Sequence, residues 1–266
     1  MSSHQSPLAR SGIIARLRAA GCVFAEDEAR LLLSAASDPA ELDAMVDRRA
    51  AGLPLEHIVG WAEFHGLRIA VDTGVFVPRR RTEFLVTRAI ALAPSGPGAV
   101  VVDLCCGSGG VGAALIAALD SPELHAADID PAAVRCARRN ITEARGQVYE
   151  GDLYDPLPGR LRGRVDILVA NVPYVPTKEI VLLPAEAREH EARVALDGGK
   201  DGLDVLRRVT AEAANWLTPG GHLLFETSAH QAAQALTAVT SGGLTAHACT
   251  SEDLPATVIT GTRPAP

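Results

Sequence analysis

Four consecutive residues, Asn171 to Tyr174, combine an amide, a rigid turn and an aromatic ring in the order Asn-Val-Pro-Tyr. They follow the apolar run 165–170, whose length and β-branched residues predict a buried strand. An asparagine amide and a backbone carbonyl can accept hydrogen bonds from a planar N–H group, and an aromatic ring can stack on its face. This chemistry suits a planar nitrogen that is a weak nucleophile because its lone pair is delocalised. The alternative is a strand end with a proline turn and a core tyrosine.

A second stretch, 100–109, runs from an apolar strand pattern into the turn Cys-Cys-Gly-Ser-Gly. Gly107 and Gly109 permit unusual backbone angles and let the chain approach a ligand closely. The helix predicted after the turn directs the positive end of its dipole toward a carboxylate or a phosphate. These features together predict a turn that binds a cofactor.

Three carboxylates lie at the ends of successive predicted strands, at Asp103, Asp128 and Asp152. Asp128 lies about 20 residues beyond the glycine turn, where an acid can bind the two hydroxyls of a ribose. Asp152 and Leu153 fit an adenine edge, with a carboxylate for the exocyclic amine and an apolar contact for the ring. Asp103 and Asp128 could instead cap helices, and Asp152 could be a turn residue. Because all three acids fall at one predicted sheet edge, we favour the joint binding interpretation.

The glycine pattern differs from the dinucleotide signature Gly-x-Gly-x-x-Gly, because Cys105 holds the usual first glycine position. The alternatives are therefore a dinucleotide and S-adenosylmethionine. The acid Asp103 before the turn, the shorter glycine spacing and the absent third glycine favour S-adenosylmethionine. Cys105 and Cys106 are expected to fill space at the turn; a redox role is the alternative, which no other residue supports.

Strand and helix patterns alternate from residue 99 onward. Strands are predicted at 99–104, 124–128, 147–150, 165–170 and 221–227, helices at 110–119, 131–144, 203–217 and 231–240, and a closing antiparallel pair at 244–249 and 255–260. The fold class is therefore α/β, with a mainly parallel doubly wound sheet whose ligands bind at the strand carboxyl ends. Asp130 directly precedes Pro131, so it is the expected N-cap of the helix at 131–144.

The residues before 81 have other patterns. Residues 1–52 predict a small helical bundle, with helices at 8–20, 25–36 and from 39 to about 52. Residues 53–80 predict a β-hairpin linker. We therefore expect three parts, namely the bundle at 1–52, the linker at 53–80 and the domain at 81–266, which begins with a helix at 82–93.

Composition narrows the partners of the chain. Hydrophobic residues make up 47% of the 266 residues and charged residues 21%, as in globular proteins. The net charge of −7 gives no general attraction to nucleic acid, so no direct nucleic-acid partner is expected. Five cysteines without a CxxC pair argue against a disulfide scaffold and a metal site. Without a signal pattern or an apolar stretch of 18 residues, we expect a cytoplasmic protein with no membrane span.

The stretch 103–109 together with Asn-Val-Pro-Tyr at 171–174 resembles class I S-adenosylmethionine-dependent methyltransferases that act on planar nitrogens. Further matches at 52–60, 63–66, 77–83, 195–203 and 217–221 narrow the likeness to the HemK/PrmC family. That family methylates the glutamine side-chain amide in the Gly-Gly-Gln loop of peptide chain release factors. The likeness runs from about residue 50 to about residue 230. It implies a Rossmann-like sheet with an antiparallel C-terminal strand, and an N-terminal helical domain that helps to bind the protein substrate.

The resemblance also implies roles for individual residues. Asn171 and the carbonyl of Val172 hold the target amide, Pro173 fixes the turn and Tyr174 packs on the amide. The implied cofactor-binding residues are Asp103, Cys105, Gly107, Gly109, Asp128, Asp152, Leu153 and Asn171. On the substrate side, the matches outside the four-residue motif are Pro78, Arg79 and Glu83.

The chain departs from the family pattern at four places. Val172 replaces the second residue of the usual Asn-Pro-Pro-Tyr, and Arg80 and Arg81 replace a proline and an acid. Ala192 replaces the proline of a Glu-Pro pair, and 227–228 replace Ile-Gly. The cofactor half is kept while the substrate side is altered, so a divergent relative with another protein substrate stays open. A nucleic-acid amino methyltransferase and a non-catalytic cofactor-binding protein are further alternatives.

Overall fold

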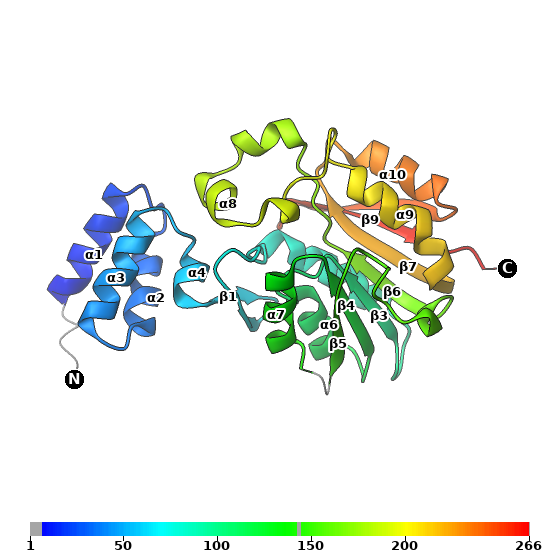
Figure 1. The fold of residues 1–266 in the computed structure, drawn as a ribbon, viewed down its shortest axis with the longest axis horizontal. Coiled ribbons are helices and arrows are strands. Elements are labelled where there is room, and N and C mark those ends of the chain that lie inside the picture. Colours follow the sequence, from blue (N-terminus) through cyan, green and yellow to red (C-terminus); the bar gives the residue numbers. More distant parts are fainter. Residues whose placement is uncertain (1–6, 143–144, 266) are drawn as a thin grey trace.

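The computed structural model describes residues 7–142 and 145–265. Its N-terminal part is a helical bundle, drawn in blue in Figure 1. The bundle contains α1 (Pro7–Ala19), α2 (Ala25–Ala35), α3 (Pro39–Ala50) and α4 (Leu55–Val59). The three predicted helices are confirmed, whereas α4 extends the helical region into the predicted linker. Asp38 caps α3 by accepting a hydrogen bond from the Glu41 amide at 2.8 Å, because Asp-Pro favours a helix start there.

A short hairpin joins the bundle to the sheet. It pairs β1 (Trp61–Phe64) with β2 (Leu67–Ala70) around a turn at His65 and Gly66. The hairpin therefore ends at Ala70, before the end of the predicted linker. The chain then continues through η2 (Arg80–Thr82) into α5 (Glu83–Leu92), where the sequence predicts a helix.

Within the described residues, seven strands form one twisted sheet in the order β5-β4-β3-β6-β7-β9-β8. The strands are β3 (Val100–Leu104), β4 (Glu123–Asp128), β5 (Gly146–Glu150), β6 (Val165–Ala170), β7 (Leu217–Thr227), β8 (Thr245–Ser251) and β9 (Ala256–Thr262). β9 pairs antiparallel with β7 and β8, and the other pairs are parallel. This confirms the predicted doubly wound α/β fold with an antiparallel C-terminal strand.

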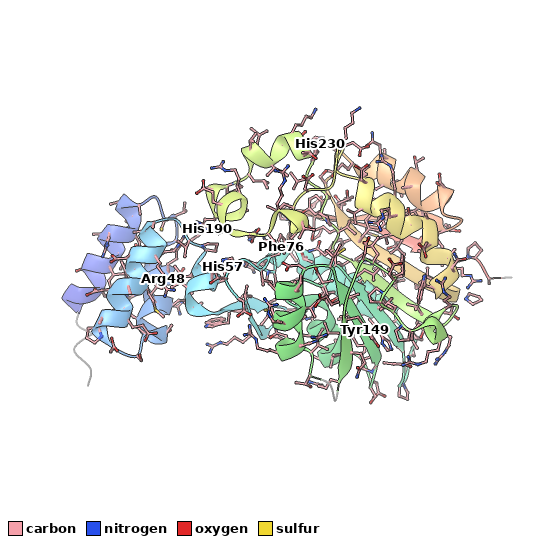
Figure 2. The ribbon with its side chains drawn as sticks, viewed as in Figure 1. Arg48, His57, Phe76, Tyr149, His190 and His230 are labelled. Carbon is pink, nitrogen blue, oxygen red and sulfur yellow. The ribbon has the colours of Figure 1, made fainter. Side chains whose placement is uncertain are left out.

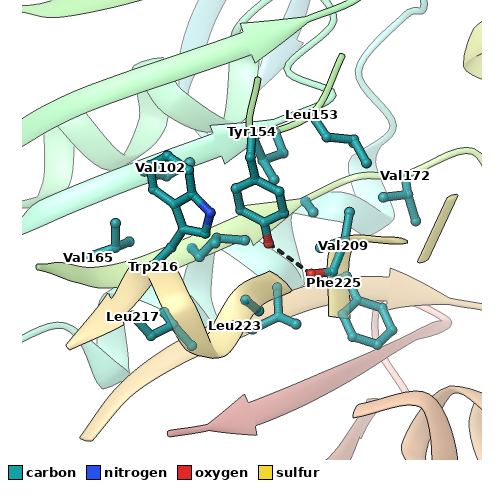
Figure 3. Close-up of a cluster of buried hydrophobic side chains, with 14 of the residues drawn as sticks. Val102, Leu153, Tyr154, Val165, Val172, Val209, Trp216, Leu217, Leu223 and Phe225 are labelled. Atoms are coloured by element: carbon teal, nitrogen blue, oxygen red, sulfur yellow. Dashed lines mark hydrogen bonds between the residues drawn. The ribbon is translucent and has the colours of Figure 1, made fainter. Parts of the chain in front are cut away.

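Helices cover both faces of the sheet. They are α6 (Gly110–Ala118), α7 (Pro131–Asn140), α9 (Asp204–Trp216) and α10 (Ala232–Ser241). Alternate residues of β3 face opposite sides, because Val102 packs with α9 and Val101 packs with α5 and α6. Figure 3 shows the first of these clusters, where the Tyr154 hydroxyl donates to the Val209 carbonyl at 2.9 Å. The predicted helix at 131–144 ends at Asn140, and residues 143–144 lie outside the described residues.

The connection between β6 and α9 contains short helices that the sequence pattern did not predict. They are η4 (Thr177–Leu182), α8 (Ala185–His190) and η5 (Arg193–Ala195), and η3 (Gly159–Leu161) precedes β6. Figure 1 shows α8 between the helical bundle and the carboxyl end of the sheet. In the part of the chain that the structure describes, no helix is long and apolar enough to cross a membrane.

Candidate functional site

A cavity of about 460 Å³ opens at the carboxyl ends of the central strands. This volume falls in the range of small-molecule and cofactor sites. Most of the predicted site residues lie in its wall: Pro78, Arg79, Asp103, Cys105, Gly107, Asp128, Asp152, Leu153, Asn171, Val172, Pro173 and Tyr174. Gly109 and Glu83 are not among the wall residues.

The glycine turn has the backbone angles that its sequence predicts. Cys105, Gly107 and Gly109 have φ angles of 54°, 56° and 78°. A Cβ atom on Gly109 would lie 3.0 Å from Ile141 Cδ1 and 3.1 Å from Ala137 Cβ, whereas a Cβ on Gly107 would meet open space. Gly109 therefore allows α6 to pack against α7, and Gly107 leaves room in the cavity.

Asp103 is almost completely buried, with 1% of its surface exposed. Its Oδ2 accepts a hydrogen bond from the Gly112 amide at 2.9 Å, in the first turn of α6. Asp103 thus accepts a hydrogen bond at the start of α6, as the helix-capping alternative predicted. Its side chain also lines the cavity, as the binding interpretation predicted. Burial raises the pKa of Asp103 to about 7, and the nearby charge of Asp128 also raises it.

Asp128 binds the glycine turn. Its Oδ2 accepts from the Gly107 amide at 2.8 Å and its Oδ1 accepts from the Asp130 amide at 2.9 Å. Burial raises the pKa of Asp128. The N-cap of α7 is Asp130, as expected, because its side chain accepts from the Ala132 amide at 2.8 Å. Asp128 is therefore free of the capping role, and its carboxylate holds the turn beside the cavity.

Asp152 and Leu153 follow β5 at the far side of the cavity. Asp152 Oδ2 pairs with Arg208 Nη2 at 2.7 Å, with both side chains partly exposed. Leu153 is buried and has a φ angle of 48°. Arg208 comes from α9, and no sequence motif marks it, because the pair joins residues 56 positions apart.

The residues in this part of the wall fit S-adenosylmethionine. Three carboxylates can bind hydroxyl and amino groups, Leu153 offers an apolar contact, and Gly107 leaves open space. A dinucleotide pyrophosphate at the glycine turn would bring its negative charges close to the Asp103 carboxyl group, which disfavours that ligand.

Asn171 directly follows the last residue of β6 and lies in the cavity wall, partly exposed. No described residue forms a hydrogen bond with its side-chain amide, so its oxygen and nitrogen remain available to a ligand. Val172 is 2% exposed and packs in the apolar cluster of Figure 3. The residue that departs from the family pattern therefore contributes core packing behind Asn171.

The loop at 196–203 supports this motif from behind. The Val175 amide donates to the Leu196 carbonyl at 3.1 Å, and the Gly198 amide donates to the Val175 carbonyl at 2.9 Å. A Cβ on Gly198 would lie 2.6 Å from the Pro173 carbonyl oxygen. The glycines of this loop are thus required because its backbone lies directly against the motif.

Arg79 and Glu83 act at the border of the cavity. Arg79 Nη2 donates to both carboxylate oxygens of Glu191, at 2.7 and 2.6 Å. Glu191 also accepts from the Val77 amide at 3.1 Å, and burial raises the pKa of its carboxyl group. Glu83 accepts from the His65 amide at 3.0 Å and so holds the hairpin turn outside the wall.

Several wall residues belong to no motif that the sequence analysis identified. They include Phe76, Glu186, Val194 and Arg208. Figure 2 shows Phe76 and His57 between the helical bundle and the carboxyl end of the sheet, close to the α8 segment. These residues come from segments far apart in the chain, so only the fold brings them together.

A family model described as methyltransferase small domain matches residues 67–201. A release factor glutamine methyltransferase from Geobacter sulfurreducens is 40% identical over 73% of this chain and 69% of its own length. One from Mycolicibacterium smegmatis is 38% identical over 82% and 78%. A 4-amino-L-phenylalanine/4-methylamino-L-phenylalanine methyltransferase from Streptomyces pristinaespiralis is 37% identical over 76% and 70%.

Solved structures share the fold. A methyltransferase from Pyrococcus furiosus has a TM-score of 0.56 at 14% identity, covering 84% of this chain and 98% of that chain. A ribosomal protein L11 methylase from Lactobacillus delbrueckii subsp. bulgaricus has a TM-score of 0.51 at 15% identity, covering 70% and 80%. The relatives, the family model and the fold agree with the cavity just described. The chain therefore belongs to the release factor glutamine methyltransferase family of class I methyltransferases.

Proposed function

We propose that this protein transfers a methyl group from S-adenosylmethionine to the side-chain amide nitrogen of a protein glutamine, in the Gly-Gly-Gln motif of a peptide chain release factor. The observation that carries the proposal is the Asn171 amide, which lies in the cavity wall without a hydrogen bond from any described residue. A polar group in such a wall is expected to bind a ligand. The names of the relatives from G. sulfurreducens and M. smegmatis support the choice of acceptor.

The cofactor would bind at the carboxyl ends of β3, β4 and β5. Asp103 and the turn at 105–109 would hold its methionine part, Asp128 its ribose, and Asp152 with Leu153 its adenine. When bound, S-adenosylmethionine supplies an electrophilic methyl group. The wall around it excludes water on the sheet side, because its backing residues are buried.

The acceptor amide would bind beside Asn171. Asn171 Oδ1 and the Val172 carbonyl would accept its two N–H groups, and the Tyr174 ring would pack on its face. Bonds from these N–H groups to carbonyl oxygens strengthen as positive charge develops on the nitrogen, which lowers the barrier. No strong general base is needed, because a methylated amide nitrogen loses its proton readily. His57 is committed elsewhere, since its Nε2 lies 2.8 Å from the Val75 carbonyl oxygen.

The helical bundle at 1–52 would help to bind the release factor, while the domain at 81–266 holds the reacting groups. The described part of the bundle contacts the cavity border through Arg49, whose Nη1 lies 2.5 Å from Glu186 Oε1. A protein docked on the bundle would thus be close to the acceptor side of the cavity.

A second acceptor class is an amine on an aromatic ring. The relative from S. pristinaespiralis is named for such a substrate, and its identity to this chain is 37%. The nitrogen of an aromatic amine is also planar with a delocalised lone pair, so Asn171 and Tyr174 could hold it by the same contacts. This similarity makes an arylamine a better second candidate for the methyl acceptor than an exocyclic amine of a nucleic acid.

The test uses S-adenosylmethionine with a labelled methyl group and purified release factors. We expect label on the wild-type factor and none on a factor whose Gly-Gly-Gln glutamine is changed to alanine. Label on both factors, or on neither, would refute the proposed acceptor. A parallel reaction with 4-amino-L-phenylalanine tests the second class.

A further inference from the structure

The hydroxyl of Tyr174 belongs to a closed ring of hydrogen bonds. It accepts from Arg81 Nη2 at 2.6 Å and donates to Glu226 Oε1 at 2.9 Å. Arg81 Nε donates to the same Glu226 oxygen at 2.8 Å, and the Thr82 hydroxyl donates to Glu226 Oε2 at 2.7 Å. Three separate elements therefore meet at one phenol: η2, the motif after β6, and the end of β7.

The buried member of this ring is Glu226, whose side chain is 3% exposed while that of Arg81 is 47% exposed. A buried carboxylate is costly unless charged or polar donors surround it. Here Arg81, Tyr174 and Thr82 supply those donors. In the parallel ladder Ala170 pairs with Phe225, so Glu226, near the end of β7, lies next to Asn171, which directly follows β6.

Tyr174 is also held at its backbone. Gln231 Nε2 donates to the Tyr174 carbonyl at 2.9 Å and to the Asp201 carbonyl at 3.0 Å. Gly202 packs so closely that a Cβ there would lie 2.3 Å from the Tyr174 carbonyl oxygen. With its carbonyl and its hydroxyl both fixed, the tyrosine ring has one orientation in the cavity wall.

We infer that Arg81, Thr82 and Glu226 are positioning residues that fix the Tyr174 ring as one wall of the acceptor site. The inference rests on the proposed function and deepens it. A ring that cannot turn away presents a flat face beside the Asn171 amide, which matches a planar acceptor such as a carboxamide or an arylamine. The restraint lowers the entropy cost of aligning the acceptor, so it acts on turnover.

Arg80 provides a matched control for Arg81. It is adjacent, exposed and outside the cavity wall, and its side chain forms no ion pair or hydrogen bond with the described residues. The same substitution to methionine can thus be made at both positions. Only the change at position 81 removes contacts to Tyr174 and Glu226.

The kinetic test is a double-mutant cycle in the full-length protein with a release factor as acceptor. We expect Tyr174→Phe and Arg81→Met each to lower kcat about tenfold, and the double variant to be no slower than the slower single variant. Both changes remove the same hydrogen bond between Arg81 and the Tyr174 hydroxyl, so their effects on kcat should not add. Arg80→Met should leave kcat within about twofold, and all variants should keep cofactor Kd within about twofold. Additive losses, or a parallel loss of cofactor affinity, would overturn the inference.

A second readout does not require activity. The chain has three tyrosines, so 3-fluorotyrosine gives three fluorine resonances, and Tyr174→Phe identifies that of Tyr174. We expect Arg81→Met and Glu226→Gln to move this resonance while those of Tyr149 and Tyr154 stay in place, which also shows that the variants fold. Arg80→Met should move none of the three. An unmoved Tyr174 resonance overturns the inference. If the resonance moves but the wild-type protein methylates no release factor, the proposed acceptor is wrong, whereas the role of Arg81 and Glu226 in positioning Tyr174 is retained.

Discussion

At the scale of single residues, Asp103 brings a carboxyl group into a nearly inaccessible part of the cavity wall. Burial raises its pKa from 3.8 to about 7, so the group is mostly neutral at pH 6 and mostly charged at pH 8. Only the charged form pairs with the ammonium group of a methionine. We therefore expect the Kd of S-adenosylmethionine to fall about tenfold from pH 6 to pH 8, measured by isothermal titration calorimetry.

The Asp103→Asn variant is the control for this pH dependence. This variant should bind S-adenosylmethionine with a higher Kd at pH 8 than wild type, and its Kd should change less with pH. The free energy of unfolding depends on pH in the opposite direction to cofactor affinity. Because the pKa of Asp103 is higher in the folded protein, its contribution to stability is complete below pH 3.8 and is lost as the pH rises through about 7. Asp103→Asn should thus unfold at higher urea concentration than wild type at pH 8. An unchanged pH slope of Kd in the variant would assign the effect to Asp128, whose pKa burial also raises.

Asn171 is the residue-scale test of the acceptor site. Because its amide forms no hydrogen bond with the described residues, Asn171→Ala removes no internal hydrogen bond of that group. We expect kcat to fall about 100-fold, cofactor Kd to stay within about twofold, and the free energy of unfolding to change by less than about 0.5 kcal/mol. Turnover within a few-fold of wild type would remove Asn171 from the acceptor site.

At the scale of elements, sequence patterns predicted those parts whose signals are local. The apolar run of β6 has the predicted bounds, and Asp130 before Pro131 begins α7. In contrast, η4, α8 and η5 are too short to show a helical period, so the sequence left this border of the cavity unassigned. The partners Arg79 and Glu191 are 112 residues apart, and no local pattern can report such a pair.

The loop behind the motif gives an element-scale prediction. Gly202 and Gly220 have φ angles of 80° and 82°, so an alanine at either position is strained by about 1 kcal/mol. Only at Gly202 would the new Cβ collide, at 2.3 Å from Gln231 Nε2 and from the Tyr174 carbonyl oxygen. We therefore expect Gly202→Ala to lower kcat at least about tenfold, because it displaces Tyr174. Gly220→Ala, whose Cβ meets open space, should keep turnover within about twofold. Equal losses in both variants would show that backbone strain alone causes the effect.

At the scale of the whole molecule, Arg49 joins the helical bundle to the border of the cavity. Its Nε donates to Glu28 Oε2 at 2.6 Å within the bundle. Its Nη1 donates to the Leu53 carbonyl at 3.0 Å and to Glu186 Oε1 of α8 at 2.5 Å. Glu28 and Arg49 are both 8% exposed, whereas the Glu186 side chain is 46% exposed. One cation thus satisfies a buried acid in the bundle and a half-exposed acid at the cavity.

This difference in burial sets the expected energies. Arg49→Met leaves the Glu28 carboxylate buried without a cation, which should cost about 3 kcal/mol of unfolding free energy. Glu186→Gln removes only the half-exposed ion pair with Arg49 and leaves the buried pair with Glu28 intact, so it should cost less than about 1 kcal/mol of unfolding free energy. Urea denaturation at pH 7, followed by circular dichroism, measures the free energy of unfolding of both variants. The helical signal is the relevant one because Glu28 and Arg49 join the helices α2 and α3. Equal, small changes would mean that Glu28 is satisfied without Arg49.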